Sequence, residues 1–333
     1  MINEIFSFKP VDTLFFRGSE PMVMGENHSS NFNFPPPVHT VEGAIRTLLY
    51  FKDKNKYRDI IRIGEKKGDF NIIGPMFLVS GEIFVPAPYS WYKEKSQKSD
   101  KPYLNKKSEE TKELRHISKF AEIFKKTEPI KVFKSTFIEG AGLIKTKSNK
   151  IYWVKADNGE LVSIGGNWIN FNDLISDSSE KVKVFSIDQF FNKEPRTGIA
   201  LKGRTVRKSH IYTFTHARLM EDVEIIFGVD KNMPFEDEEI LTLGAEQRFG
   251  SLKRLKNFEN FKEKFNSDNK NGEYMSLSII EGNKEANEHI IASGQIKYIG
   301  GWDLHKRFHK GIVGYYPAGT VFDERICNGL VSI

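Results

Sequence analysis

The sequence predicts an α+β fold built from short strands and few helices. Short apolar runs of strand length, bounded by Gly, Pro, Asn or Asp, recur along most of the 333 residues. One segment near the N-terminus has helical periodicity, with apolar residues on one face at Val41, Ala44, Ile45, Leu48 and Leu49. A strand–helix–hairpin half followed by a second strand-rich half is consistent with a duplicated α+β unit.

The first half predicts a strand, a helix and a hairpin in that order. Residues 2–17 alternate apolar and polar side chains, which indicates one or two strands. The prolines at 35–37 fix an extended entry to the helix, and Thr40 is a suitable N-cap. Residues 74–86 contain two apolar runs around a Ser-Gly pair, the pattern of a β-hairpin. This succession is the opening of a βαββαβ unit.

The second half is separated from the first by a change in composition. Lysine alternates with Glu, Ser and Asp after residue 92, which predicts an insertion near 91–128 whose charges are solvated. Beyond a region of short strand-like runs, strands are expected at 223–229, at 274–280 and on both sides of a basic loop within 295–321. The expected domains are 1–195, which carries the insertion, and 196–333.

Composition restricts the class of protein. The net charge of +6 and the pI of about 9.0 favour an anionic partner. The single cysteine, Cys327, excludes a disulfide framework and a Cys-based zinc site within the chain, and it fits a reducing compartment. The first residues lack the pattern of a signal peptide, and no apolar run approaches the ~20 residues of a membrane-spanning helix. We therefore expect a cytoplasmic protein with no membrane partner.

The most informative stretch is residues 194–219, where no Asp or Glu occurs between Pro195 and Met220. Its cations are Arg196, Lys202, Arg204, Arg207, Lys208 and Arg218. Glycines at 198 and 203 allow a close backbone approach, and apolar runs on either side anchor the stretch. We interpret it as a basic loop suited to a polyanion, because Lys and Arg neutralise phosphates and release counterions. The alternative is a solvated basic loop on an ordinary surface.

Catalytic motifs are absent from the sequence. It has no GxxxxGK[ST], HExxH, GxSxG or CxxC. Five histidines near basic or glycine-rich segments are possible acids or bases in metal-free RNA cleavage, namely His39, His210, His216, His305 and His309. The carboxylates are scattered, and the acidic run 236–239 is interpreted as the solvated start of a helix. We expect no catalytic residue, no metal and no cofactor; the helix start near His39 is a possible phosphate seat.

Five segments, taken in order, resemble one family. They are DTLFFRGSEP at 12–21, FPPPVHTVEGAIRT at 34–47, RTGIALKGRTV at 196–206, LGAEQRFGS at 243–251 and GGWDLHK…YYPAGTVF at 300–322. Together they are similar to the third subunit of the Cmr complex, the type III-B CRISPR effector, in the RAMP superfamily. Two positions depart from the family pattern. Gly18 replaces an acidic residue, and residues 244–248 hold fewer glycines than the family's GGEGR.

The resemblance implies two ferredoxin-like (RRM-like) domains and a non-catalytic subunit that binds the 5′ tag of the guide RNA (crRNA) in antiviral defence. It implies docking on the large polymerase-like subunit and on the repeated backbone subunit. The RNA contacts it implies are Arg17, His39, Arg46, Arg196, Lys202, Arg204, Arg207, Arg248, Lys306 and Arg307. Ring faces for bases are available at Phe15, Phe16, Phe249 or Tyr212, although a core position is the favoured interpretation for each.

Two other functions stay open at the level of sequence. One is a metal-independent RNA-processing endoribonuclease of the same superfamily. The other is a protein adaptor that makes no RNA contact. The modest net charge fits a subunit that shares its RNA with neighbouring subunits.

Overall fold

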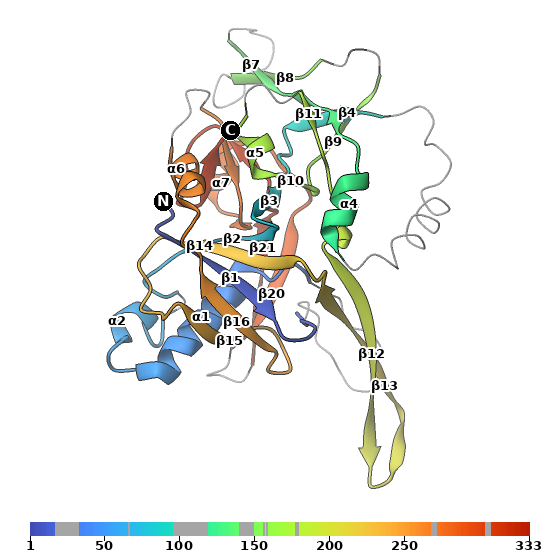
Figure 1. Cartoon of the computed structure of the whole chain (residues 1–333), viewed down its shortest axis with the longest axis vertical. Helices are drawn as coiled ribbons and strands as arrows, with labels where there is room; N and C mark the ends of the chain where they lie inside the picture. The colour runs from blue at the N-terminus through green and yellow to red at the C-terminus, as the bar shows by residue number, and fades with distance from the viewer. Residues whose placement is uncertain are drawn as a thin grey trace.

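The computed structural model describes residues 1–16, 33–65, 67–95, 119–139, 150–155, 157, 159–176, 180–267, 272–303 and 308–333. Within these ranges the chain is a mixed α/β structure, mostly strands with few helices (Figure 1). The predicted α+β class is therefore confirmed. Among the helices that the structure describes, none is long and apolar enough to span a membrane.

A seven-stranded antiparallel sheet forms the centre of the molecule. Its strands, in spatial order, are β10 (Trp168–Asn170), β3 (Glu82–Pro86), β2 (Ile72–Val79), β14 (Val223–Val229), β1 (Glu4–Pro10), β16 (Phe249–Arg254) and β15 (Glu238–Thr242). β1 lies between β14 and β16, with Phe6 opposite both Phe227 and Arg254. The strands expected at the N-terminus, at 74–86 and at 223–229 are all present, and they belong to this one sheet.

Helix α1 (Val38–Asp53) covers one face of the sheet. Its buried residues Val41, Ile45 and Leu49 pack with Phe6 and Phe8 of β1, which confirms the predicted helical face. The helix begins earlier than expected, because Pro37 and not Thr40 occupies the N-cap position. Proline has no N–H to leave unpaired and its φ is already set, so the helix can start directly after the third proline.

The C-terminal part of the chain covers half of the other face. The elements there are α6 (Glu259–Asn266), α7 (Lys284–His289) and a sheet of β19 (Ile290–Ala292), β22 (Val321–Phe322), β17 (Tyr274–Ser276) and β23 (Leu330–Ser332). Phe261, Phe265 and Met275 pack in one core with Ile5 and Ile226. On this same face of the sheet, β15 and β16 carry exposed apolar side chains, such as Ile240.

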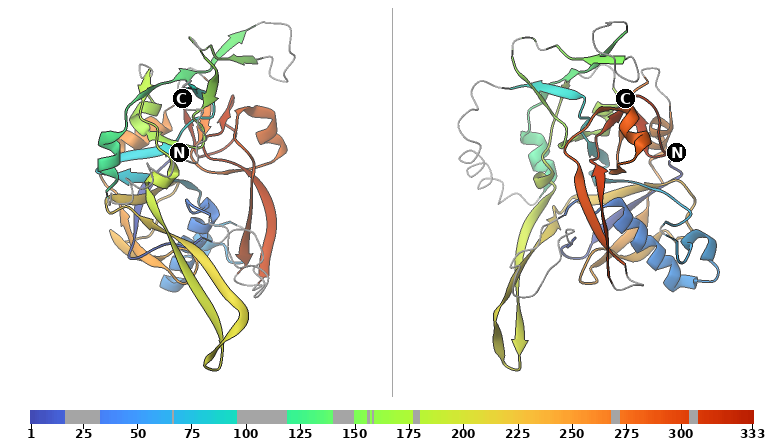
Figure 2. Two further views of the ribbon diagram at one scale, coloured as in Figure 1. Left: turned by 90° about the vertical axis from the view of Figure 1, so that its right-hand side faces the viewer. Right: turned by 180° about the vertical axis from the view of Figure 1, so that it is seen from behind.

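The basic stretch is not a loop. It forms two long antiparallel strands, β12 (Phe191–Lys202) and β13 (Thr205–Leu219), paired from Phe191↔Leu219 to Lys202↔Thr205. Within the described residues the two strands pair with each other, apart from one isolated bridge between Ala217 of β13 and Leu14, and they project from the body as an arm (Figures 1 and 2). The glycines at 198 and 203 favoured the interpretation as a loop. Proline and glycine are tolerated in strands at a sheet edge, and each strand of a two-stranded ribbon is an edge strand.

The smaller elements surround this framework. The remaining strands are β4 (Trp91–Glu94), β5 (Ile130–Lys131), β6 (Phe133–Lys134), β7 (Thr136–Glu139), β8 (Lys150–Trp153), β9 (Leu161–Ser163), β11 (Lys181–Val182), β18 (Ile280–Glu281), β20 (Lys297–Asp303) and β21 (Phe308–Tyr316). The remaining helices are α2 (Arg58–Ile61), α4 (Phe120–Lys126), α5 (Phe171–Leu174) and the 3-10 turn η1 (Ile187–Gln189). β20 and β21 confirm the two strands expected within 295–321.

Two features bear on the expected domain layout. The boundary at 195/196 falls inside β12, and the central sheet takes strands from both sides of it, so the two-domain division stays a prediction. Of the predicted insertion near 91–128, residues 96–118 lie outside the described chain, and β4 and α4 lie at its two ends. The acidic run at 236–239 was wrongly interpreted as a helix start. Its last two residues, Glu238 and Glu239, belong to edge strand β15 and pair with Lys253 and Leu252 of β16.

Candidate nucleic-acid interface

Three segments far apart in sequence meet at the base of the β12–β13 hairpin, around Asp12. Its Oδ2 accepts hydrogen bonds from Arg196 Nη2 at 3.1 Å and Arg248 Nη1 at 2.9 Å, and its Oδ1 accepts from Arg218 Nη2 at 2.9 Å. Arg196 comes from β12, Arg218 from β13 and Arg248 from the turn between β15 and β16. One carboxylate thus joins the end of β1, both strands of the hairpin and the β15–β16 turn.

Two further carboxylates complete what we term the Asp12 cluster: Asp12, Glu194, Arg196, Arg218, Glu246 and Arg248. Glu194 accepts from Arg196 Nη2 at 2.8 Å and from Arg218 Nε at 2.7 Å, and Glu246 accepts from Arg248 Nη2 at 2.9 Å. Three guanidinium groups therefore face three carboxylates. The cluster is close to electrically neutral, so it fixes the hairpin to the body more than it presents free charge to a ligand.

The pKa values in the cluster follow from these contacts. Partial burial raises the pKa of Asp12, but the hydrogen bonds from Arg196, from the Thr13 backbone and from Arg218 outweigh it and hold the pKa at about 2. Hydrogen bonds from Arg218 and then Arg196 lower the pKa of Glu194. Both carboxylates are ionised at neutral pH, which keeps the cluster intact.

His216 lies beneath the cluster, 1% exposed. Its Nδ1 is 3.0 Å from Thr13 Oγ1, and its ring stacks on Phe15 with centroids 5.2 Å apart. Burial lowers its pKa, a shift that nearby Glu246 opposes and the cluster arginines reinforce. The imidazole is therefore neutral at pH 7 and enclosed by protein, which does not suit a general acid or base acting on an RNA strand.

Replacing Asp12 with alanine tests the cluster. We expect the free energy of unfolding at pH 7 to fall by about 1–2 kcal/mol, because three partly exposed ion pairs are lost and solvent screening limits each of them. The folded pKa of Asp12 is below its ordinary 3.8, so its stabilisation is present above pH 4 and is lost as the pH falls through about 2.

The measurement is urea unfolding of both proteins at pH 7, 4 and 2.5. The difference between them should shrink toward the lowest pH, while His216 makes both proteins less stable below pH 6.5 because its folded pKa is depressed. Asp237→Ala, which removes an exposed partner of Lys256, is the control and should have little effect. A constant difference at all three pH values would contradict this role of Asp12.

The start of α1 forms a second candidate contact. The helix has no side-chain cap and no acidic residue in its first turn, so its first N–H groups are available to an anion. His39 stacks on Tyr315 of β21, with centroids 6.1 Å apart, and within the described residues its buried Nδ1 has no hydrogen-bond partner. Burial and the charge of Lys310 lower its pKa. The second and fifth family-like segments thus meet here.

The other predicted contacts are placed as follows. Arg204 is exposed in the turn of the hairpin, and Lys202 and Arg207 lie in its strands on either side, where their side chains are outside the described part. Arg46 is engaged by protein, since it donates to the carbonyls of residues 61, 62 and 65 at 2.9–3.1 Å. The predicted contacts at Arg17, Lys306 and Arg307 fall outside the described residues.

The four aromatic residues that were considered for base stacking differ in their exposure. Phe15 and Phe16 are buried, as favoured, and the side chain of Tyr212 is outside the described part. Phe249 is 49% exposed and not in the core, because it lies on the uncovered half of the sheet. The sequence interpretation missed the part played by Asp12, Glu194 and Arg218. The signal available was that Asp12 begins the first family-like segment.

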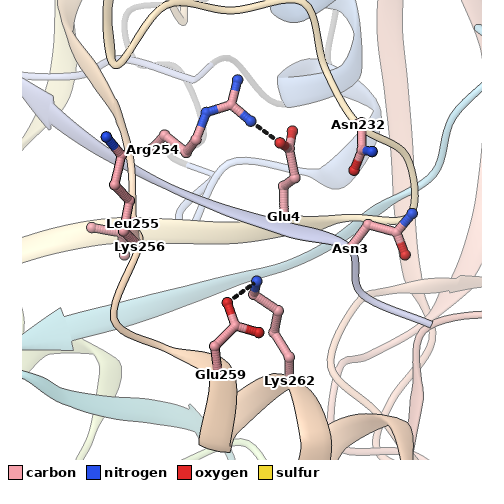
Figure 3. Close-up of a pocket in the computed structure, with 8 residues that line it drawn as sticks. All are labelled: Asn3, Glu4, Asn232, Arg254, Leu255, Lys256, Glu259 and Lys262. Carbon is pink, nitrogen blue, oxygen red and sulfur yellow. Dashed lines mark hydrogen bonds and ion pairs between the residues drawn. The ribbon is translucent and has the colours of Figure 1, made fainter.

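A separate polar pocket of about 300 Å³ lies between β1, β16 and α6 (Figure 3). Four of its charged groups pair with one another, Glu4 with Arg254 and Glu259 with Lys262 at 2.6 Å, and Lys256 pairs with Asp237 outside the pocket at 2.7 Å. It therefore offers little uncompensated charge to a ligand. Across the described ranges, no group of three His, Cys, Asp or Glu side chains is placed to hold a metal ion.

Comparison with known proteins identifies the family of the chain. A family model described as CRISPR-associated protein (Cas_Cmr3) matches residues 6–280. No curated protein sequence matches the chain.

Three solved structures illustrate the likeness. A chain of the type III-B Cmr-beta complex bound to cognate target RNA is 15% identical, with 96% of this chain and 86% of that chain covered and a TM-score of 0.54. A chain of the same complex with target RNA and AMPPnP is 14% identical, with 96% and 85% covered and a TM-score of 0.52. A chain of a Csm3-Csm4 subcomplex is 14% identical, with 99% and 94% covered and a TM-score of 0.44. The first two show a shared fold.

Proposed function

Since this chain belongs to the Cas_Cmr3 family of CRISPR-associated proteins, we propose that it is a non-catalytic subunit of a type III-B RNA-guided effector complex that binds the 5′ tag of the guide RNA. In this proposal it acts in the cytoplasm and docks on the large polymerase-like subunit and the repeated backbone subunit. The complexes that contain chains of the same fold are described as bound to cognate target RNA, which supports RNA as a partner.

The observation that carries the proposal is the convergence of segments at the hairpin base. Asp12, Arg196 and Arg248 come from three of the five family-like segments, and both arginines donate hydrogen bonds to Asp12. The hairpin they hold carries Lys202, Arg204 and Arg207 near its turn. An arm held in place loses less conformational entropy when it binds, and cations near its end suit phosphate neutralisation. We assign the cluster to orientation and the end of the hairpin to RNA contact.

The start of α1 supplies the second RNA contact in this proposal. Its uncapped N–H groups suit a phosphate oxygen, and His39 and Lys310 add polar and positive groups beside them. A defined tag needs more than one contact to be held in register, since phosphate contacts position a strand and contacts to bases select it. Two separate phosphate contacts on one chain can position the RNA strand.

The sheet supports one half of the expected ferredoxin-like pair. The strands β16–β1–β14–β2 lie in that order, and α1 connects β1 to β2, which is the arrangement of a split β–α–β unit. Along the chain, edge strand β15 comes between β14 and β16, at the point where the second helix of such a unit is expected. We propose that the first domain consists of this sheet with its insertions. We assign the second domain to the C-terminal elements.

The test is the double variant Arg204→Ala/Arg207→Ala in a reconstituted complex. We expect its affinity for guide RNA carrying the 5′ tag to fall by about tenfold relative to the wild type, because two phosphate contacts are lost. The matched control is Lys125→Ala/Lys126→Ala, which removes two exposed cations from the last turn of α4. Unchanged tag binding and assembly in the arginine variant would refute the role of the hairpin.

Two assays address the alternative functions. Incubation of the pure protein with repeat RNA in the absence of metal should yield no products, and clean site-specific cleavage would establish the endoribonuclease instead. Crosslinking of the assembled complex should attach guide nucleotides to this chain. If none attaches, the protein is an adaptor.

A further inference from the structure

The corner where α1 ends and α2 begins, residues 50–63, is a basic and aromatic surface outside the family-like segments. It holds five cations and two carboxylates, a net charge of +3 compared with +6 for the whole chain. Tyr50 and Phe51 are 42% and 81% exposed, and their rings meet edge to face with centroids 5.8 Å apart. We call this surface the α1–α2 corner.

Most of its positive charge is not balanced by neighbouring carboxylates. Lys52 pairs with Glu239, and Arg62 pairs with Glu65 and Asp69. Within the part that the structure describes, no carboxylate pairs with Lys54, Lys56 or Arg58, all of which are exposed. Of the two acidic side chains in the corner, Asp53 accepts hydrogen bonds from the backbone N–H groups of residues 55 and 56. The unpaired cations therefore outnumber the remaining free carboxylate, Asp59.

The structure of the corner uses these side chains little, although Lys56 Nζ lies over the Tyr57 ring, 5.3 Å from its centroid. Phe51 projects into solvent from the last turn of a helix whose packing is made by Val41, Ile45 and Leu49. The end of α1 gains from one or two cations near its C-terminus, and Lys52 already supplies one. An exposed aromatic pair beside three unpaired cations is therefore best explained by a partner.

We propose that the α1–α2 corner binds single-stranded RNA, with Phe51 stacking on a base and Lys54, Lys56 and Arg58 contacting phosphates. Single-strand binding combines aromatic platforms with a positively charged track and needs no particular sequence. A protein partner is less consistent with the corner, because lysine is depleted from protein interfaces. The proposal does not depend on the hairpin.

The corner is distinct from both contacts of the proposed function. It lies at the other end of α1 from His39, and a helix of 16 residues is about 24 Å long. The views in Figures 1 and 2 place α2 and the end of the β12–β13 hairpin on opposite sides of the molecule. A strand bound at the corner is therefore either a distant part of the same RNA or a second RNA.

The experiment is a fluorescence-anisotropy titration of a labelled 12-nucleotide oligouridylate with the full chain, made in the Arg204→Ala/Arg207→Ala background. This background removes two cations from the hairpin. We expect Phe51→Ala to weaken binding by about tenfold, and the combined Lys54→Ala/Lys56→Ala/Arg58→Ala variant to reduce the salt slope of log Kd by about 2. Phe51→Trp should bind as the parent does, and Lys125→Ala/Lys126→Ala on α4 is the charge control.

A leucine at residue 51 separates stacking from general apolar contact. Phe51→Leu keeps the apolar bulk and loses the ring, so it should bind as weakly as Phe51→Ala. Binding within twofold of the parent by either variant would overturn the inference and leave tag recognition by the hairpin untouched. If Phe51 instead governs binding to phosphatidylserine vesicles and not to RNA, the corner is a lipid-facing surface and the inference also fails.

Discussion

Replacing Gly319 with alanine is expected to lower the free energy of unfolding by about 3–5 kcal/mol, from left-handed backbone strain and a steric clash together. Gly319 has φ +93°, and a Cβ there would lie 2.4 Å from the carbonyl oxygen of Ala87. Neither neighbour can move freely, because the Gly319 N–H donates to Ser276 O at 2.7 Å and its own carbonyl accepts from Tyr89 N at 3.0 Å. The residue connects the C-terminal sheet to the segment after β3.

Two other glycines separate the causes of that loss. Gly81 has φ +86° and no atom within 4 Å of an added Cβ, so Gly81→Ala measures backbone strain alone, about 1–2 kcal/mol. Gly43 lies in the exposed part of α1 with open space around it, and Gly43→Ala should stabilise the protein by about 0.5–1 kcal/mol. Urea unfolding of the three variants gives the comparison. A loss for Gly319→Ala no larger than that for Gly81→Ala would show that the clash is relieved.

Replacing Phe190 with alanine is expected to lower the free energy of unfolding by about 3–5 kcal/mol. Its ring is fully buried and stacks on Phe77 and Phe120, with centroids 4.5 Å and 4.3 Å apart. Its carbonyl accepts from Met220 N at 3.0 Å, which closes the root of the β12–β13 hairpin. We therefore expect amide exchange in the first residues of the hairpin to increase more than exchange in β1.

The controls for Phe190 are another substitution at the same site and an exposed phenylalanine. Phe190→Leu retains most of the volume and should lose less than about 1.5 kcal/mol. Phe51→Ala removes a ring that is mostly in solvent and should change stability by less than about 0.5 kcal/mol. If Phe190→Ala destabilises the protein without faster exchange at the hairpin root, the root is held by the Asp12 cluster and the Leu14–Ala217 bridge and not by the Phe190 packing.

The sequence predicted the elements whose signal is local. The face of α1 was recognised because Val41, Ile45 and Leu49 repeat with the helical period, and the strand at 223–229 because it is a short, continuous apolar run. The sheet order was not predictable in this way. β1 pairs with β14 and β16, more than 200 residues away in the chain, and no local pattern specifies such a partner. The hairpin was missed because its cations and glycines favoured a loop, and the pairing of β12 with β13 is not visible in either segment alone.

The candidate site was predicted in part, for a similar reason. Arg196 and Arg248 were named because they lie in basic or glycine-containing segments that resemble a family. Their common partner Asp12 was not named, because ion pairing across more than 180 residues leaves no trace in either segment. The exposure of Phe249 likewise depends on which half of the sheet the C-terminal elements cover, and that is a tertiary property.

The position of β1 in the middle of the sheet has a consequence for synthesis on the ribosome. The strand is translated before both of its neighbours, which do not exist until residues 223–254 have been translated. At roughly 5–20 residues per second, its apolar side chains wait about 10–45 s for a partner strand. The nascent chain thus has an unpaired apolar segment while more than 200 further residues are added, and we expect its yield in cells to depend on chaperones that shield that segment.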